Sequence, residues 1–128
     1  MTHKTTRKDE DYFEARVHHW LRVLGLGDWM VEVYRSKLTD MSAACELWHD
    51  AHGAHIMLNE ELKYQPPKRW LNRLALHEVG HVLLCDLKRL TKDRCVTDSM
   101  IDTAEHAVIR RLENALAAAE RTASKEER

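Results

Sequence analysis

Two histidines four residues apart, with a glutamate directly after the first, form an H-E-x-x-H motif at residues 77–81 of this 128-residue chain. In a helix, residues four apart lie one turn above each other on the same face, so His77 and His81 can offer two imidazole nitrogens to one metal ion. Glu78 can then hold a water molecule at that metal without occupying a coordination position. This residue set predicts a hydrolytic zinc site with Zn²⁺ as the cofactor.

The segment around the motif predicts a helix that carries the histidines inward. The stripe with helical spacing that includes both histidines also includes Trp70, Leu74 and Leu84, and a second stripe is formed by Leu76, Leu83, Leu87 and Leu90. Polar side chains inside a helix packed on most sides need partners, and a metal ion would supply them. The alternative is that the motif arises by chance in a chain rich in histidine and glutamate, within a metal-free helical adaptor.

A catalytic zinc ion has three protein ligands, so a third must come from elsewhere in the chain. The last predicted helix should pack against the motif helix, and Glu105 lies on its inward stripe, in register with Ile101 and Val108. We therefore predict Glu105 as the third ligand, with His106 as the alternative. A further alternative is that Glu105 and His106 are surface residues paired with an arginine such as Arg110.

A second group of histidines, His49, His52 and His55, is spaced by three residues across a predicted hairpin. These side chains could meet across the strands, but they lack helical spacing, and solvated histidines at the end of a hairpin are the favoured interpretation. Cys85 continues the row after His81 but lies further along the helix axis, so it is predicted to pack as a small hydrophobic residue.

The composition predicts one globular domain over residues 1–128, with residues 1–8 and 120–128 frayed, because 44% of the residues are hydrophobic. A net charge of −1 gives no indication of nucleic-acid binding. No apolar run reaches the length of a membrane span, and the N-terminus lacks the apolar region of a secretory signal. Three cysteines without C-x-x-C spacing fit a reducing compartment, so we expect a cytoplasmic protein.

The predicted fold class is α+β with a small, mostly antiparallel three-stranded sheet. An amphipathic helix over residues 9–24 ends at Gly25 and is followed by strands at 29–35, 42–48 and 54–58, the last two forming a hairpin. Residues 42–48 also allow a helix. The motif helix begins at Pro66 and runs to Leu90, and a final helix begins at Asp98 or Ser99 and continues to about residue 119.

This order of elements, with His-Glu-Val-Gly-His on one helix and Ala104-Glu105-His106 on the last, resembles the minimal zincin fold of small metallopeptidases. It is similar to metallopeptidases of phage and prophage genomes, and more distantly to ImmA/IrrE-type and SprT-type proteins. The resemblance implies His77 and His81 as zinc ligands and Glu78 as general base. It supports Glu105 if the third ligand is a glutamate, as in gluzincins, and His106 if the site is SprT-like.

The leading functional hypothesis is therefore a zinc metallopeptidase that acts on a peptide or protein substrate. The resemblance implies that a strand beside the motif helix binds the substrate in extended form, and residues 54–59 match that strand. Tyr64 and His106 are candidate donors to the tetrahedral intermediate. The alternative from another class is a zinc-stabilised interaction module without catalysis, which a closed site with four protein ligands would favour.

Overall fold

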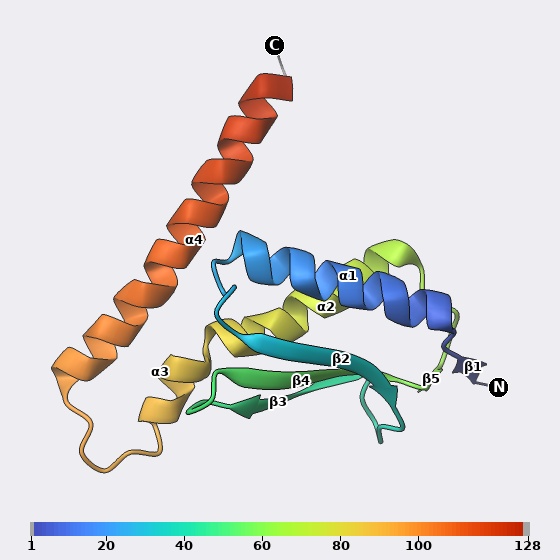
Figure 1. The fold of residues 1–128 in the computed structure, drawn as a ribbon, viewed down its shortest axis with the longest axis horizontal. Coiled ribbons are helices and arrows are strands. Elements are labelled where there is room, and N and C mark those ends of the chain that lie inside the picture. The colour runs from blue at the N-terminus through green and yellow to red at the C-terminus, as the bar shows by residue number, and fades with distance from the viewer. Residues whose placement is uncertain (1, 127–128) are drawn as a thin grey trace.

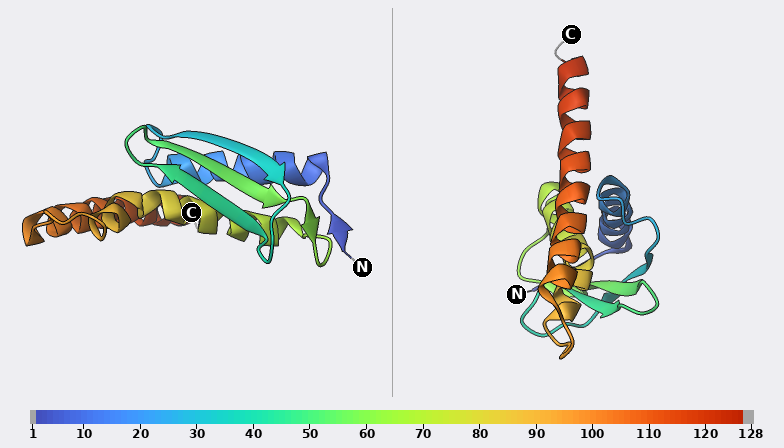
Figure 2. Two further views of the ribbon diagram at one scale, coloured as in Figure 1. Left: turned by 90° about the horizontal axis from the view of Figure 1, so that it is seen from below. Right: turned by 90° about the vertical axis from the view of Figure 1, so that its left-hand side faces the viewer.

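The computed structural model describes residues 2–126, with side-chain surroundings for all of these except residues 120 and 123–126. They form an α+β arrangement in which two helices lie side by side on one face of a three-stranded sheet (Figures 1 and 2). The elements are β1 (His3–Lys4), α1 (Arg7–Val23), β2 (Met30–Ser36), β3 (Ala43–Trp48), β4 (Gly53–Asn59), β5 (Glu61–Leu62), α2 (Lys68–Leu83), α3 (Cys85–Leu90) and α4 (Asp98–Glu126). Over the described range, no helix combines the length and apolar character needed to span a bilayer.

Helix α1 begins at a capping box and ends before a glycine, which confirms the first predicted helix. The Thr6 hydroxyl accepts a hydrogen bond from the Asp9 amide (3.2 Å), and the Asp9 carboxylate accepts one from the Thr6 amide (2.9 Å). Gly25 follows the helix with a φ of +70°, a conformation that favours glycine. These two signals fix the length of α1, so that one apolar stripe faces the sheet.

The sheet has strand order β2-β4-β3, and all three strands lie where the alternation of apolar residues predicts them. Strand β4 pairs with β3 in antiparallel and with β2 in parallel orientation. The prediction of a mostly antiparallel sheet is therefore wrong for one of its two pairings. The parallel pair forms because β3 crosses to the far side of the sheet, which leaves the central position for β4. The hairpin of β3 and β4 is confirmed.

The core lies between the helices and the sheet. Its largest fully buried side chains include Phe13 and Val17 from α1, Ile56 and Leu58 from β4, and Leu71, Val79 and Val82 from α2. Burying an apolar side chain of this size stabilises the folded state by about 1.5–3 kcal/mol. The central strand therefore provides the apolar surface against which both helices are aligned.

The N-terminal residues are ordered, which corrects the prediction that residues 1–8 are frayed; residue 1 lies outside the described range. Strand β1 pairs with β5 in a separate two-stranded sheet. The Thr5 hydroxyl lies 3.0 Å from the Asn59 carbonyl oxygen, and the Arg35 guanidinium donates to the Thr5 carbonyl (2.6 Å). A polar composition had suggested solvation, but these contacts pair the backbone with a distant segment.

The predicted motif helix is divided in two. Helix α2 ends at Leu83, and Leu84 has φ −92° and ψ 3°, so the chain turns before α3 begins at Cys85. A straight helix from Pro66 to Leu90 was therefore wrong. The turn allows Cys85 to be buried in the core, which confirms its prediction as a small hydrophobic residue.

Helix α4 does not pack along the motif helix as predicted. Its main helix contact is with α3, and from there it extends beyond the body of the protein (Figures 1 and 2). Ala115 packs against the core, whereas Ile109, Leu112 and Leu116 are exposed. The helix continues to Glu126, past the predicted end near residue 119. The chain after α3 thus adds little to the wall around residues 77–81.

Candidate metal centre

Helix α2 turns its two histidines toward solvent and its glutamate toward the core. The stripe that packs inward consists of Leu71, Ala75, Glu78, Val79 and Val82. His77 and His81 are exposed, as are Trp70 and Leu84 on the same stripe. The prediction that the histidine stripe faces the interior is therefore wrong, because the more apolar neighbouring stripe occupies the interface with α1 and the sheet.

The side chains of His77, Glu78 and His81 converge as their spacing predicts. One potential ligand atom from each lies within 4.8 Å of the others, and among the described residues this is the one group of at least three such side chains. The two imidazole rings are 5.1 Å apart at their centroids. Two nitrogens bound to a tetrahedral zinc ion are separated by about 3.4 Å, so small side-chain rotations would bring these residues onto one ion.

A cleft of about 600 Å³ opens beside this group. It is bordered by α2 on one side and by the segment that leads into β3 on the other; its lining residues are Met41, Ser42, Ala43, Trp70, Arg73, Leu74, His77 and Glu78. Arg73 supplies a cationic side chain one helical turn before His77. Sequence reasoning missed Arg73, although its i−4 spacing from His77 was a usable signal.

Glu78 lies at the inner wall of the cleft with only 4% of its surface exposed. Burial raises the pKa of its carboxyl above the ordinary value of 4.5, and the nearby His81 and His77 partly oppose this shift. Burial, together with the Glu78 charge, also raises the pKa of the neighbouring Cys45 thiol to about 12. The site therefore holds a carboxyl with a strong affinity for a proton, beside a cysteine that stays a thiol.

We expect Glu78→Gln to stabilise the protein after metal has been removed with a chelator. The pKa of Glu78 is raised on folding, so the stability contributed by its protonated form is present below pH 4.5 and is lost as the pH rises through the folded-state pKa. Glutamine carries no charge and avoids this loss. At pH 7 the variant should melt a few degrees higher, since ~1 kcal/mol corresponds to ~3–5 °C in a domain of this size.

This difference should disappear near pH 4, where both side chains are neutral. Thermal melts followed by circular dichroism at pH 4 and pH 7 measure it. Equal melting temperatures at pH 7 would contradict a desolvated Glu78 carboxylate.

The predicted third ligands are not part of the group. Glu105 and His106 are exposed on α4, which departs along α3 rather than along α2. The His106 ring instead donates from Nδ1 to the Asp102 carbonyl on its own helix (2.7 Å). The described structure thus brings His77, Glu78 and His81 together and leaves both Glu105 and His106 outside.

The three histidines of the hairpin have three separate partners; they are half-buried and hydrogen-bonded, rather than solvated as the favoured interpretation had it. His49 Nε2 lies 2.5 Å from the Asp86 carboxylate, and His52 Nδ1 lies 2.8 Å from that of Asp28. His55 lies on the outer face of the sheet, with Nδ1 3.1 Å from the Tyr34 hydroxyl and Nε2 3.3 Å from Glu32. Each ring nitrogen engaged in this way is unavailable to a shared metal ion.

The strand beside the site differs from the one that the resemblance implied. Strand β4, at residues 53–59, is paired on both sides and offers no free edge. Among the described strands, β3 is the edge strand next to α2, and its first residue, Ala43, lines the cleft with His77. Tyr64 lies further away, in an adjoining cavity that His77 does not line.

Asn59 holds the wall of the cleft opposite α2. Its side-chain amide donates to the carbonyls of Leu38 (3.0 Å) and Met41 (2.8 Å). Its side-chain oxygen accepts from the backbone amides of Leu38 (3.3 Å) and Glu61 (3.1 Å). The backbone amide of Asn59 donates to the Ser42 carbonyl (2.9 Å). Sequence reasoning missed this role of Asn59, for which the only signal was a polar residue at the end of a buried strand.

A scan of protein-family models and searches of curated proteins and of solved structures find no match to this chain. The functional argument therefore depends on the geometry of residues 77–81 and of the cleft beside them.

Proposed function

We propose that this protein is a zinc-dependent peptide hydrolase with a zincin-like fold. The observation that supports it best is the convergence of potential ligand atoms of His77, Glu78 and His81 within 4.8 Å, beside an open cleft that His77 and Glu78 line. The order of a helix, a small sheet and then the motif helix agrees with such a fold at the level of α+β architecture.

The donor set suits zinc. Neutral imidazole is a preferred zinc ligand, and both histidines are exposed, with His77 lining the cleft, so an ion can reach them from solvent. When bound there, zinc would act as a Lewis acid that polarises a substrate carbonyl and acidifies water. His77 and His81 would hold the ion, and Glu78 lies close enough to both to accept a hydrogen bond from a water molecule at that ion.

Glu78 would act as the proton carrier of the reaction. As a carboxylate it accepts a proton from the attacking water, whose oxygen forms a bond to the peptide carbonyl carbon. The raised pKa of Glu78 favours this step because burial penalises the charged form. Glu78 then returns the proton to the amide nitrogen as the carbon–nitrogen bond breaks, which releases a carboxylic acid and an amine; the acid then passes its proton to the amine or to water. Arg73 can stabilise negative charge on the carbonyl oxygen from the same cleft wall.

The edge of β3 is where an extended peptide would bind. Strand addition satisfies the backbone groups of an edge strand and gives affinity that depends little on sequence. Because β3 leads directly out of the cleft wall at Ser42 and Ala43, a peptide paired with it passes His77 and Glu78. This placement corrects the expectation for residues 54–59.

The alternative, a structural zinc in an interaction module, needs four protein ligands around a closed ion. The described group offers two histidine ligands and the Glu78 carboxyl beside a cleft, which favours an open, catalytic type of site over a closed one.

The first test is zinc bound per chain, measured by elemental analysis of untagged protein. We expect about one zinc ion for the unaltered protein, and little or none after His77→Ala or His81→Ala. His18→Ala is the matched control, because His18 is a half-exposed histidine on α1, far from the group in the chain. Absence of zinc, together with a melting temperature that zinc does not raise, would contradict the proposal.

The same assay decides the third ligand. If α2 alone provides the ligands, Glu105→Gln and His106→Ala should contain as much zinc per chain as the unaltered protein. A lower zinc content in one of these variants would identify that residue as a ligand, which α4 could supply only by moving toward α2.

A further inference from the structure

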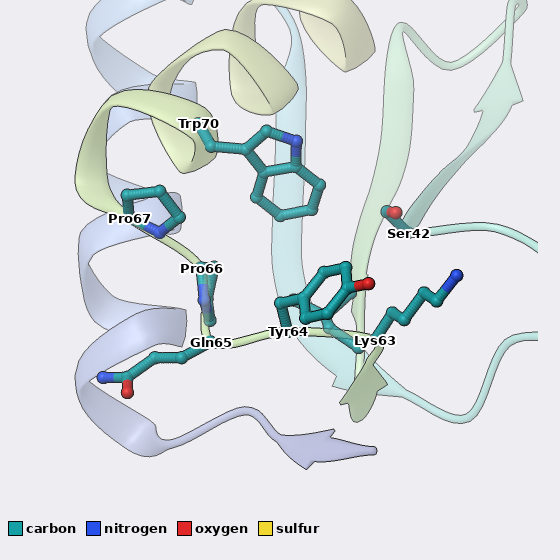
Figure 3. Close-up of a pocket in the computed structure, with 8 residues that line it drawn as sticks. Ser42, Lys63, Tyr64, Gln65, Pro66, Pro67 and Trp70 are labelled. Carbon is teal, nitrogen blue, oxygen red and sulfur yellow. The ribbon is translucent and has the colours of Figure 1, made fainter. Parts of the chain in front are cut away.

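A second cavity adjoins the metal cleft at the beginning of α2. It has a volume of about 210 Å³ and shares Ser42 and Trp70 with the cleft. Its walls are mainly apolar: Leu62, Pro66, Pro67 and the rings of Tyr64 and Trp70. Figure 3 shows the Trp70 indole directed toward Tyr64 and Ser42, with Pro66 and Pro67 to the left, on the connector before α2. A cavity of ~150 Å³ can hold a benzene ring, so this one has room for a phenylalanine or leucine side chain.

The distance from His77 to the second cavity can be compared with the length of an extended peptide substrate. Trp70 precedes His77 by seven residues in α2, which corresponds to roughly 10 Å along the helix axis. An extended peptide advances ~3.3 Å per residue, so about three residues separate the reacting bond from the second cavity.

The direction of β3 determines which end of a bound peptide would reach the second cavity. Strand β3 and α2 run the same way in Figure 2, with Ser42 next to Trp70 at their beginnings. A peptide that adds to β3 in antiparallel orientation, as β4 does on the other side, runs back toward Ser42. Its C-terminal part then reaches the second cavity.

On the basis of the proposed function, we propose that this cavity is a substrate subsite for an apolar, preferably aromatic, side chain about three residues C-terminal to the cleaved bond. Trp70 and Tyr64 form its walls and determine the preference. Pro66, which is buried, and Pro67 restrict the backbone of the connector before α2, so the cavity exists before substrate arrives.

Two measurements test the proposal independently. In the first, N-acetyl-phenylalanine methylamide is titrated into the full-length protein, and the indole N–H signals of the tryptophans are followed by NMR. The Trp70 signal should shift, whereas that of Trp48 should not; Trp48 is a matched probe because 46% of it is exposed, compared with 38% of Trp70. The aspartate analogue of the fragment should shift neither. No shift of Trp70 would overturn the proposal whether or not the protein is a hydrolase.

In the second measurement, a mixed peptide library is digested and the cleavage sites are read by mass spectrometry. We expect enrichment of Phe, Leu or Met three residues after the cut, with cleavage of such peptides ~10-fold or more faster than of alanine analogues. Trp70→Ala should abolish the preference and Trp48→Ala should retain it. Tyr64→Ser offers a second variant that cannot disturb the core, because Tyr64 is 74% exposed.

The outcomes separate the two proposals. A Trp70 shift without any cleavage keeps the apolar side-chain site and removes the hydrolase. Cleavage without a preference at that position, or with the preference on the N-terminal side, overturns the subsite as we describe it.

Discussion

Replacing Glu78 by glutamine is expected to lower peptide hydrolysis by a factor of ~100–10,000, the usual contribution of a general base, while zinc binding is retained. Glutamine has nearly the same shape as glutamate, so it fills the same buried place behind His77 and His81. It cannot accept the proton of the attacking water, and the reaction then depends on the metal alone. Cleavage rates at a fixed zinc occupancy, measured on the best peptide from the library, give the factor.

The matched control is Glu113→Gln, which removes the same charge from an exposed position on α4, outside the proposed substrate-binding strand. Its cleavage rate should be that of the unaltered protein. Turnover by the Glu78→Gln variant within a few-fold of the unaltered enzyme would contradict the role of Glu78 as general base, even with zinc bound.

Asn59→Ala is expected to destabilise the protein by ~2–4 kcal/mol, the largest effect of any single polar substitution that we predict. The side chain makes four hydrogen bonds to the loop between β2 and β3 and to the start of β5. Each such bond contributes ~1 kcal/mol, and because all four bonds are part-buried, the partners that lose them add some desolvation cost. Urea unfolding followed by fluorescence measures the change.

Asn59→Asp distinguishes these bonds from a simple loss of volume. The aspartate oxygen can still accept from the amides of Leu38 and Glu61, but a second oxygen faces the carbonyls of Leu38 and Met41. The variant should therefore be destabilised at pH 7 although its side chain has the same size. Because Met41 and Ser42 form one wall of the metal cleft, both variants should also bind peptides more weakly. A decrease of less than ~1 kcal/mol in the free energy of unfolding of both variants would contradict the role of Asn59 in holding this loop.

The elements and the convergence of His77, Glu78 and His81 could be predicted because they depend on local spacing. The i, i+4 relation of His77 and His81 and the capping box at Thr6 involve residues within one helical turn. Which stripe of α2 faces the core was not accessible in this way, because the stripe with two histidines and the stripe with Glu78 are both largely apolar. Only the surroundings of α2 decide between them.

The remaining differences involve contacts between distant parts of the chain. The turn at Leu84 has neither proline nor glycine to indicate it, and the direction of α4 follows from that turn. The prediction that α4 supplies Glu105 or His106 depended on a packing that local sequence cannot specify. The parallel pairing of β2 with β4 likewise has no signal in the sequence of either strand.

The central position of β4 has a consequence for the order in which the fold assembles. Strands β2 and β3 occupy the two edges of the sheet and are joined only through β4, the last of the three in the chain. The β3–β4 hairpin can close quickly because its strands are neighbours in sequence, whereas docking of β2 requires closure of a longer loop. Until residues 53–59 are in place, β2 therefore has no neighbour in the sheet, and its unpaired edge is the segment most exposed to contacts with other chains during folding.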